Sequence, residues 1–165
     1  MFLAELGWLT IQWAKLETTL ELPCAYLVKA NFSNKEDLQP PRAFRQRVKF
    51  IKVQLYNPLF VHLRFEFITV LDSLFALSDQ RNALIHSTFS EWTNPQSATS
   101  TTIKIDTGSY VAHLDQVVTL TDICRLTEQV DRAVRSLINL GDRLRCLIRG
   151  FDLNPNFQRR IILRD

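Results

Sequence analysis

The sequence lacks the short motifs that several common enzyme classes require. It contains no glycine-rich phosphate-binding loop, no Ser–His–Asp nucleophile elbow and no paired-carboxylate motif, so nucleotide hydrolysis by a P-loop and hydrolase-fold chemistry are disfavoured. Its three cysteines, Cys24, Cys124 and Cys146, show no C-x-x-C spacing. An odd set of this kind predicts neither a disulfide framework nor a zinc site. We therefore expect no metal and no cofactor.

Long apolar runs are also missing. No stretch of about 18 uncharged apolar residues occurs, so no membrane span is expected. The first segment carries Glu5, Lys15 and Glu17 and lacks both a basic leading region and a small-residue cleavage site, which argues against a signal peptide. Together with unpaired cysteines, these features predict a cytoplasmic location. The net charge of +3 permits a polyanionic partner without requiring one.

Length and composition predict one globular domain over residues 1–165, because 165 residues that are 46% hydrophobic can bury a core of their own. Apolar residues spaced by three and four predict a helix over residues 3–29, which Pro23 should kink or break. A polar loop is expected over residues 31–41, and a shorter helix after it. That helix turns Phe44, Val48, Ile51 and Leu55 inward and places Arg42, Arg45, Arg47, Lys49 and Lys52 on its other faces.

Asn57 followed by Pro58 is a start signal for a long helix, since asparagine caps free amides and proline fits the first turn. From there an apolar stripe continues to Leu84, and its only charged member is Arg81. Short alternating runs around Gly108 predict a β-hairpin or another ordered excursion over residues 93–117.

A last long helix is expected after a cap at Thr119 or Thr121 and should stop at Gly150. Its predicted apolar stripe consists of Ile123, Leu126, Val130, Ala133, Leu137, Leu140, Leu144 and Leu147. The tail 151–165 contains Ile161, Ile162 and Leu163, which either dock onto the body or onto a partner. These segments predict an all-α fold, a four- to five-helix antiparallel bundle with the excursion inserted before its last helix.

Arg81 is the residue in this pattern that needs an explanation. Desolvating a guanidinium without a partner costs several kcal/mol, so either Glu17 or Asp79 pairs with it in a structural network, or the site grips a phosphate. Asn82 and His86 lie about 40° apart around the same helix and extend the site into a polar patch. Arginine can bind a phosphodiester and histidine can move a proton near neutral pH.

The segment RNALIHS, residues 81–87, resembles the signature of the HEPN superfamily: an arginine, a polar residue directly after it, and a histidine after a gap of four to six residues. The layout agrees with this resemblance, because the signature follows a first helix containing GWLTIQWAKLETTL, ends a long helix, and precedes an aromatic stretch and a final long helix.

The resemblance implies a HEPN-like helical bundle that dimerises and brings two signatures into one composite cleft. It implies that Arg81 holds the scissile phosphate, His86 acts as the acid or base, and Asn82 orients them. Glu17 resembles the acidic residue found on the first helix in some branches of the family. Further substrate contacts are expected from Ser87, Trp92, Arg45 and Lys49, of which the last two belong to a basic group that is alternatively only a solvated helix face.

The leading hypothesis is a metal-independent endoribonuclease of a toxin–antitoxin or anti-phage defence system, acting as a homodimer. An antitoxin or a nucleotidyltransferase is a possible further partner that the resemblance implies. The alternative is a catalytically inactive helical module that binds a protein or an RNA as a sensor or scaffold. His62 and His113 have no second ligand at metal spacing, so packing or surface roles are expected for both.

Overall fold

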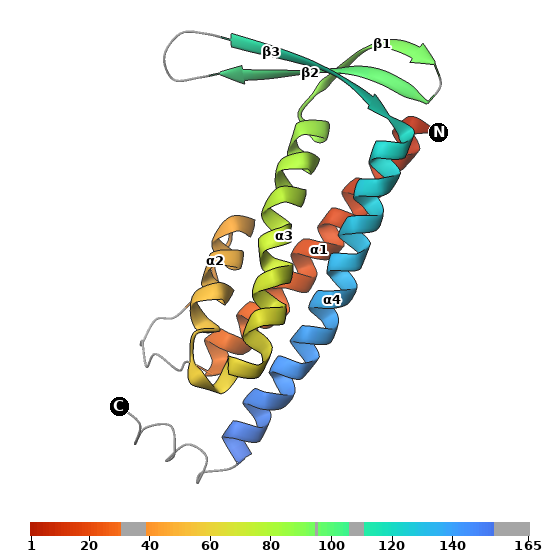
Figure 1. Cartoon of the computed structure of the whole chain (residues 1–165). Helices are drawn as coiled ribbons and strands as arrows, with labels where there is room; N and C mark the ends of the chain where they lie inside the picture. Colours follow the sequence, from red (N-terminus) through yellow and green to blue (C-terminus); the bar gives the residue numbers. More distant parts are fainter. Residues whose placement is uncertain (31–38, 95, 106–110, 154–165) are drawn as a thin grey trace. The chain divides into compact units, whose positions relative to one another are not determined.

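The computed structural model describes residues 1–30, 39–94, 96–105 and 111–153. It is mostly helical, and a small antiparallel sheet precedes the last helix (Figure 1). The helices are α1 (Phe2–Ala30), α2 (Phe44–Gln54), the 3-10 turn η1 (Pro58–Phe60), α3 (Val61–Ile85) and α4 (Leu120–Leu153). The strands are β1 (Thr88–Asn94), β2 (Ser97–Ile105) and β3 (Val111–Thr119).

The contacts divide the chain into two compact units. Unit 1 consists of Met1–Ala14 and Phe75–Arg132, and unit 2 takes in the described parts of Lys15–Leu74 and Ala133–Asp165. The helices α1, α3 and α4 each contribute one segment to each unit. We describe the two units separately.

In unit 2, α1 continues through Pro23 to Ala30. The prediction of a helix break at Pro23 is therefore wrong. Proline removes one backbone donor, but here the ring is buried and lines a small cavity of about 40 Å³ together with Tyr26 and Leu137. Packing of the proline ring thus outweighs the lost hydrogen bond.

The start of α3 follows the predicted signal. The Asn57 side chain accepts a hydrogen bond from the Leu59 amide at 3.0 Å, and Pro58 opens the 3-10 turn that leads into the helix. The helix α2 buries Val48 and Ile51 as predicted.

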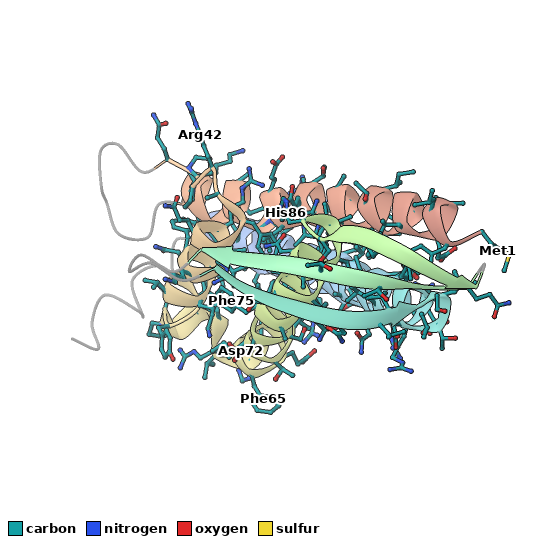
Figure 2. All side chains as sticks on the ribbon, turned by 90° about the horizontal axis from the view of Figure 1, so that it is seen from above. Met1, Arg42, Phe65, Asp72, Phe75 and His86 are labelled. Atoms are coloured by element: carbon teal, nitrogen blue, oxygen red, sulfur yellow. The ribbon has the colours of Figure 1, made fainter. Side chains whose placement is uncertain are left out.

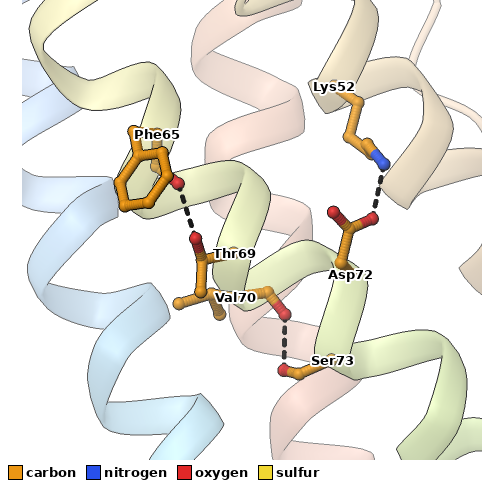
Figure 3. A network of polar contacts seen from close by, with 6 residues as sticks. All are labelled: Lys52, Phe65, Thr69, Val70, Asp72 and Ser73. Carbon is orange, nitrogen blue, oxygen red and sulfur yellow. Dashed lines mark hydrogen bonds and ion pairs between the residues drawn. The ribbon is translucent and has the colours of Figure 1, made fainter.

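Ion pairs connect the helical segments of unit 2 to one another. Lys52 of α2 contacts Asp72 of α3 at 2.6 Å (Figure 3). Arg143 of α4 binds both carboxylate oxygens of Glu66, at 2.6 and 3.0 Å. Because these side chains are between 29% and 56% exposed, the pairs orient the helices more than they stabilise them.

Three helix ends meet the sheet in unit 1. The helix α3 leads directly into β1, and β3 leads directly into α4. The Phe2 ring near the start of α1 contacts the Phe89 ring of β1 edge-on, with 5.5 Å between centroids. Within unit 1, α3 therefore leads toward the sheet, whereas α1 and α4 lead away from it.

The sheet is larger than the predicted hairpin. The three strands pair in the order β1-β2-β3, all antiparallel, and β1 begins directly after the signature. The sequence predicts only an aromatic stretch, STFSEW, over residues 87–92. The pairing of β1 with β2 shifts register between Ser90 and Trp92 and again between Trp92 and Asn94. Such irregularities blur the strict alternation by which a strand is recognised in a sequence.

Thr119 caps α4, one of the two predicted candidates. Its hydroxyl accepts from the Asp122 amide at 3.2 Å and donates to the Asp122 carboxylate at 2.7 Å, and its own amide donates to the same carboxylate at 3.0 Å. This reciprocal arrangement is a capping box. Hydrogen bonds from the side chain and the backbone of Thr119 lower the pKa of Asp122 below its ordinary value.

We expect Thr119→Ala to lower the free energy of unfolding by about 1 kcal/mol at pH 7, whereas Thr121→Ala, at an exposed position one residue into the helix, should change it by less than about 0.5 kcal/mol. Because the Asp122 pKa is lowered in the folded protein, its contribution is present above the unfolded pKa of about 3.9 and is lost as the pH falls through the folded value. Urea unfolding at pH 7 and pH 3 measures this. Equal losses for the two variants, or a larger Thr119 effect at pH 3, would contradict the capping assignment.

The helix α4 departs from its predicted pattern at the C-terminal end. It continues past Gly150 to Leu153, so the predicted stop at Gly150 is wrong. Leu147 is 37% exposed, and Ile148 is buried in its place. An α-helix has 3.6 residues per turn, so a stripe read at a shorter period drifts off the buried face over the nearly seven turns from Ile123 to Leu147.

Several predictions fall outside the described residues. They concern the loop over 31–38, the turn at Gly108, and the docking of Ile161, Ile162 and Leu163. Within the ranges that are described, no helix has both the length and the apolarity needed to cross a membrane.

Candidate functional site

Arg81 lies on α3 in unit 1, in line with the buried residues Leu77 and Leu84, as the stripe predicts. The guanidinium carbon lies 5.7 Å from the centroid of the Trp13 ring, at the distance of a cation–π contact. Trp13 comes from α1 and is only 4% exposed. The charge therefore rests on an aromatic surface at a seam between two helices, and the side chain keeps partial access to solvent.

Asn82 completes the immediate surroundings of the arginine. Arg81 Nη1 donates to Asn82 Oδ1 at 3.0 Å, which fixes the guanidinium plane against the neighbouring turn. Arg81 Nε is buried and has no hydrogen-bond partner among the described protein atoms. Because this nitrogen is buried, an oxyanion from solvent can meet only the Nη groups of the half-buried side chain.

His86 lies one residue beyond α3 and its side chain is exposed. Its backbone amide donates to the Asn82 carbonyl at 3.0 Å, so the backbone here continues the helical path. Figure 2 labels His86 beside the sheet. Five residues correspond to about 140° around a helix. The imidazole of His86 and the guanidinium of Arg81 in the same chain therefore leave the helix in different directions.

The predicted site residues are divided between the two units. Ser87 is adjacent to His86, and its hydroxyl donates to the Ala83 carbonyl. Glu17 is half-buried on α1, but it belongs to unit 2, as do the exposed side chains of Arg45 and Lys49 on α2. Trp92 and His113 lie in β1 and β3, and their side chains fall outside the described part.

Sequence reasoning missed four glutamines of unit 1. Gln12 is 7% exposed, and its Oε1 has no hydrogen-bond partner in the described part of the chain. Gln80, Gln116 and Gln129 line one open groove with a volume of about 390 Å³. These residues come from α3, β3 and α4, and no spacing within the sequence signals that they meet.

The cysteines do not form a reactive centre. Burial raises the pKa of Cys24 to about 12, which keeps this thiol protonated and unreactive. Desolvation and the neighbouring Glu5 carboxylate raise the pKa of Cys124. Within the described residues, no three His, Cys, Asp or Glu side chains gather in a way that could hold a metal ion.

Comparisons of the chain with protein-family models, with curated proteins and with solved structures find no match.

The energetic role of Arg81 can be measured separately from its chemistry. We expect Arg81→Leu to change the free energy of unfolding by less than about 1 kcal/mol. The variant loses the contact with Trp13 and one hydrogen bond, but it continues the apolar stripe and removes a buried donor without a partner. Urea unfolding, with Arg132→Leu at an exposed position as control, measures this. A loss of several kcal/mol for Arg81→Leu alone would identify a structural arginine network.

Proposed function

We propose that the protein is a metal-independent, HEPN-type endoribonuclease that acts as a symmetric homodimer in a cytoplasmic defence or toxin–antitoxin system. The observation that carries the proposal is the state of Arg81. Its guanidinium is oriented by Trp13 and Asn82, belongs to a side chain that keeps partial access to solvent, and lies one and a half helical turns before the exposed imidazole of His86.

The proposed reaction is an internal transfer at one phosphodiester. A histidine takes the proton from the ribose 2′-OH, and the 2′-oxygen attacks phosphorus while the bond from phosphorus to the 5′-oxygen breaks. The leaving 5′-oxygen takes up a proton, so the products are a 2′,3′-cyclic phosphate and a 5′-hydroxyl. Arg81 would stabilise the additional negative charge on the pentacoordinate phosphorus, and Asn82 would keep Arg81 in position.

A second copy of the chain explains how both groups reach one phosphate. Within one chain the side chains of Arg81 and His86 diverge by about 140°, so we place the substrate in a cleft to which both copies contribute. In support, the outward face of α1 in unit 1 is apolar, with Leu3 63%, Trp8 49% and Ile11 57% exposed. Exposed apolar side chains gathered on one face are typical of interaction surfaces.

The test is cleavage of labelled single-stranded and hairpin RNA by the purified protein in excess EDTA, with the product ends mapped. We expect cleavage to persist in EDTA and to leave cyclic phosphate ends. An absence of cleavage by the dimer, both alone and with the protein encoded next to it, would eliminate the enzyme hypothesis. Cleavage that requires a divalent ion would eliminate the mechanism.

The alternative function is an inactive module that binds a protein or an RNA. The contacts that Arg81 already makes within the chain favour this alternative. Arg81 already has an aromatic surface and an amide as partners, so the signature can persist for packing alone. An antitoxin or a nucleotidyltransferase would then be the bound partner. Stable binding of such a partner or of RNA, without cleavage in any condition tested, distinguishes the module from the nuclease.

A further inference from the structure

An open groove lies on unit 1 between α3, β3 and α4. Its residues all belong to this unit, so the groove is formed by a single compact part of the chain. Its volume of about 390 Å³ lies in the range of sites that hold small molecules. It is lined by Gln80, Ala83, Leu84, Gln116, Val118, Asp122, Arg125, Leu126 and Gln129.

The floor of the groove is apolar and its rim is polar. Leu84, Val118 and Leu126 are each at most 9% exposed, so they form a firm surface. Gln80 and Gln116 are exposed on the rim. A planar ligand can lie on such a floor while its edge meets polar groups on the walls.

The three glutamine amides of the groove are unused by the fold. Across the described ranges, the side-chain amides of Gln80, Gln116 and Gln129 have no hydrogen-bond partner in the protein. Each amide offers one acceptor and two donor hydrogens. Together they give the rim an uncharged, adaptable set of donors and acceptors.

The two charged residues of the groove differ in how they are held. The Asp122 carboxylate accepts hydrogen bonds from the hydroxyl and the amide of Thr119, at 2.7 and 3.0 Å. Arg125 Nη1 is 3.7 Å from this carboxylate, and the arginine side chain is 65% exposed. Since an exposed pair at this distance is weak, the guanidinium can turn toward a ligand in the groove.

The geometry points to a binding site for a nucleobase, with adenine as the best fit. The edge of adenine presents an adjacent donor and acceptor, which one glutamine amide can pair with in two hydrogen bonds. Cytosine and uracil also offer such a pair, but the two fused rings of adenine give a larger surface for stacking. The apolar floor and the plane of the Arg125 guanidinium provide surfaces on which a base can stack. The Asp122 carboxylate, which is hydrogen bonded to Thr119, places a negative charge in the groove. The groove is therefore not suited to binding an anion alone.

The groove shares its α3 wall with the signature. Gln80, Ala83 and Leu84 lie within one helical turn of Arg81, so a base seated there would determine which phosphate reaches the arginine. In naming RNA as the source of the base, this inference rests on the proposed function. A free adenine nucleotide has the same chemistry and is a separate arm of the test.

The experiment measures binding without cleavage. Fluorescein-labelled, fully 2′-O-methylated oligo(A), oligo(U) and oligo(C) cannot be cut by attack of a 2′-OH, and their affinities follow from fluorescence anisotropy. We expect oligo(A) to bind about tenfold more tightly than oligo(U). Gln80→Leu and Gln129→Leu should remove most of this preference, and Gln46→Leu, at an exposed glutamine of unit 2, should retain it.

The outcomes separate the groove from the nuclease. Weak binding of every oligonucleotide, equal affinity for all three, or a preference that the groove variants keep would each overturn the inference, whatever the cleavage assay shows. A preference for oligo(A) that the groove variants lose supports it, even if unmodified RNA is not cut. Competition by adenosine monophosphate as strong as that by oligo(A) assigns the groove to a free nucleotide, and much weaker competition assigns it to RNA.

Discussion

His86→Ala is expected to lower the rate of RNA cleavage by roughly 10²- to 10⁴-fold, the contribution usual for a positioned acid or base. The imidazole is exposed, and only the backbone of His86 hydrogen bonds to the helix. The substitution should therefore leave the free energy of unfolding within about 0.5 kcal/mol of the wild type. Cleavage rates in EDTA and urea unfolding of the same preparations measure the two effects.

The control for this variant is His62→Ala. His62 is also an exposed histidine on α3, but it lies in unit 2. It should retain full cleavage activity. If both variants lose activity equally, the loss reflects a general effect of the substitution, and the assignment of His86 is wrong.

Arg81 variants distinguish charge from geometry in the same assay. Arg81→Ala should reduce cleavage at least as much as His86→Ala does, because it removes both the charge and the donors aimed at the phosphate. Arg81→Lys keeps the charge but cannot offer a planar fork, and we expect it to remain at least tenfold below the wild type. Full activity of Arg81→Lys would show that only charge matters at this position.

The helices were predictable because the local signals, helix caps and helix-forming residues, agree with the spacing of the apolar residues that pack in the core. The spacing of apolar residues and the Asn57 and Thr119 caps identify α1, α3 and α4 within a few residues, and the structure confirms them. Pro23 and Gly150 each carry a local tendency to end a helix, a penalty of about 1–3 kcal/mol. At Pro23 the packing of the buried ring outweighs it, whereas α4 continues for three residues past the exposed Gly150.

The candidate site was predictable only in part, because some of its residues are neighbours in the sequence and others come from distant segments of the chain. The signature is local and visible in the sequence. Trp13 is 68 residues from Arg81, and Gln80 is 36 residues from Gln116 in the groove. A single sequence contains no signal for such pairings. The strand β1 was missed for a related reason, since its bulged pairing with β2 depends on residues beyond itself.

Trp13→Ala is expected to be the most destabilising change near the site, with a loss of about 3–5 kcal/mol in the free energy of unfolding. Trp13 is 4% exposed in unit 1 and supports the Arg81 guanidinium at 5.7 Å. The matched control is Trp8→Ala on the same helix, where the indole is 49% exposed and the loss should be below about 1 kcal/mol. Thermal and urea unfolding of both variants give the comparison, and similar losses would contradict the burial of Trp13.

Trp13→Phe separates the packing of the indole from its contact with the arginine. Phenylalanine retains an aromatic face but is the weaker partner of a cation, so the protein should remain folded while Arg81 becomes less constrained. A double-mutant cycle of Trp13→Phe with Arg81→Leu measures the coupling between the two side chains, which we expect to be about 0.5–1 kcal/mol. If the coupling is measurable and Trp13→Phe also lowers cleavage more than it lowers stability, the indole positions the arginine for its phosphate. If the coupling is absent, the stacking of Arg81 on Trp13 contributes nothing to the site, and Asn82 alone orients the guanidinium.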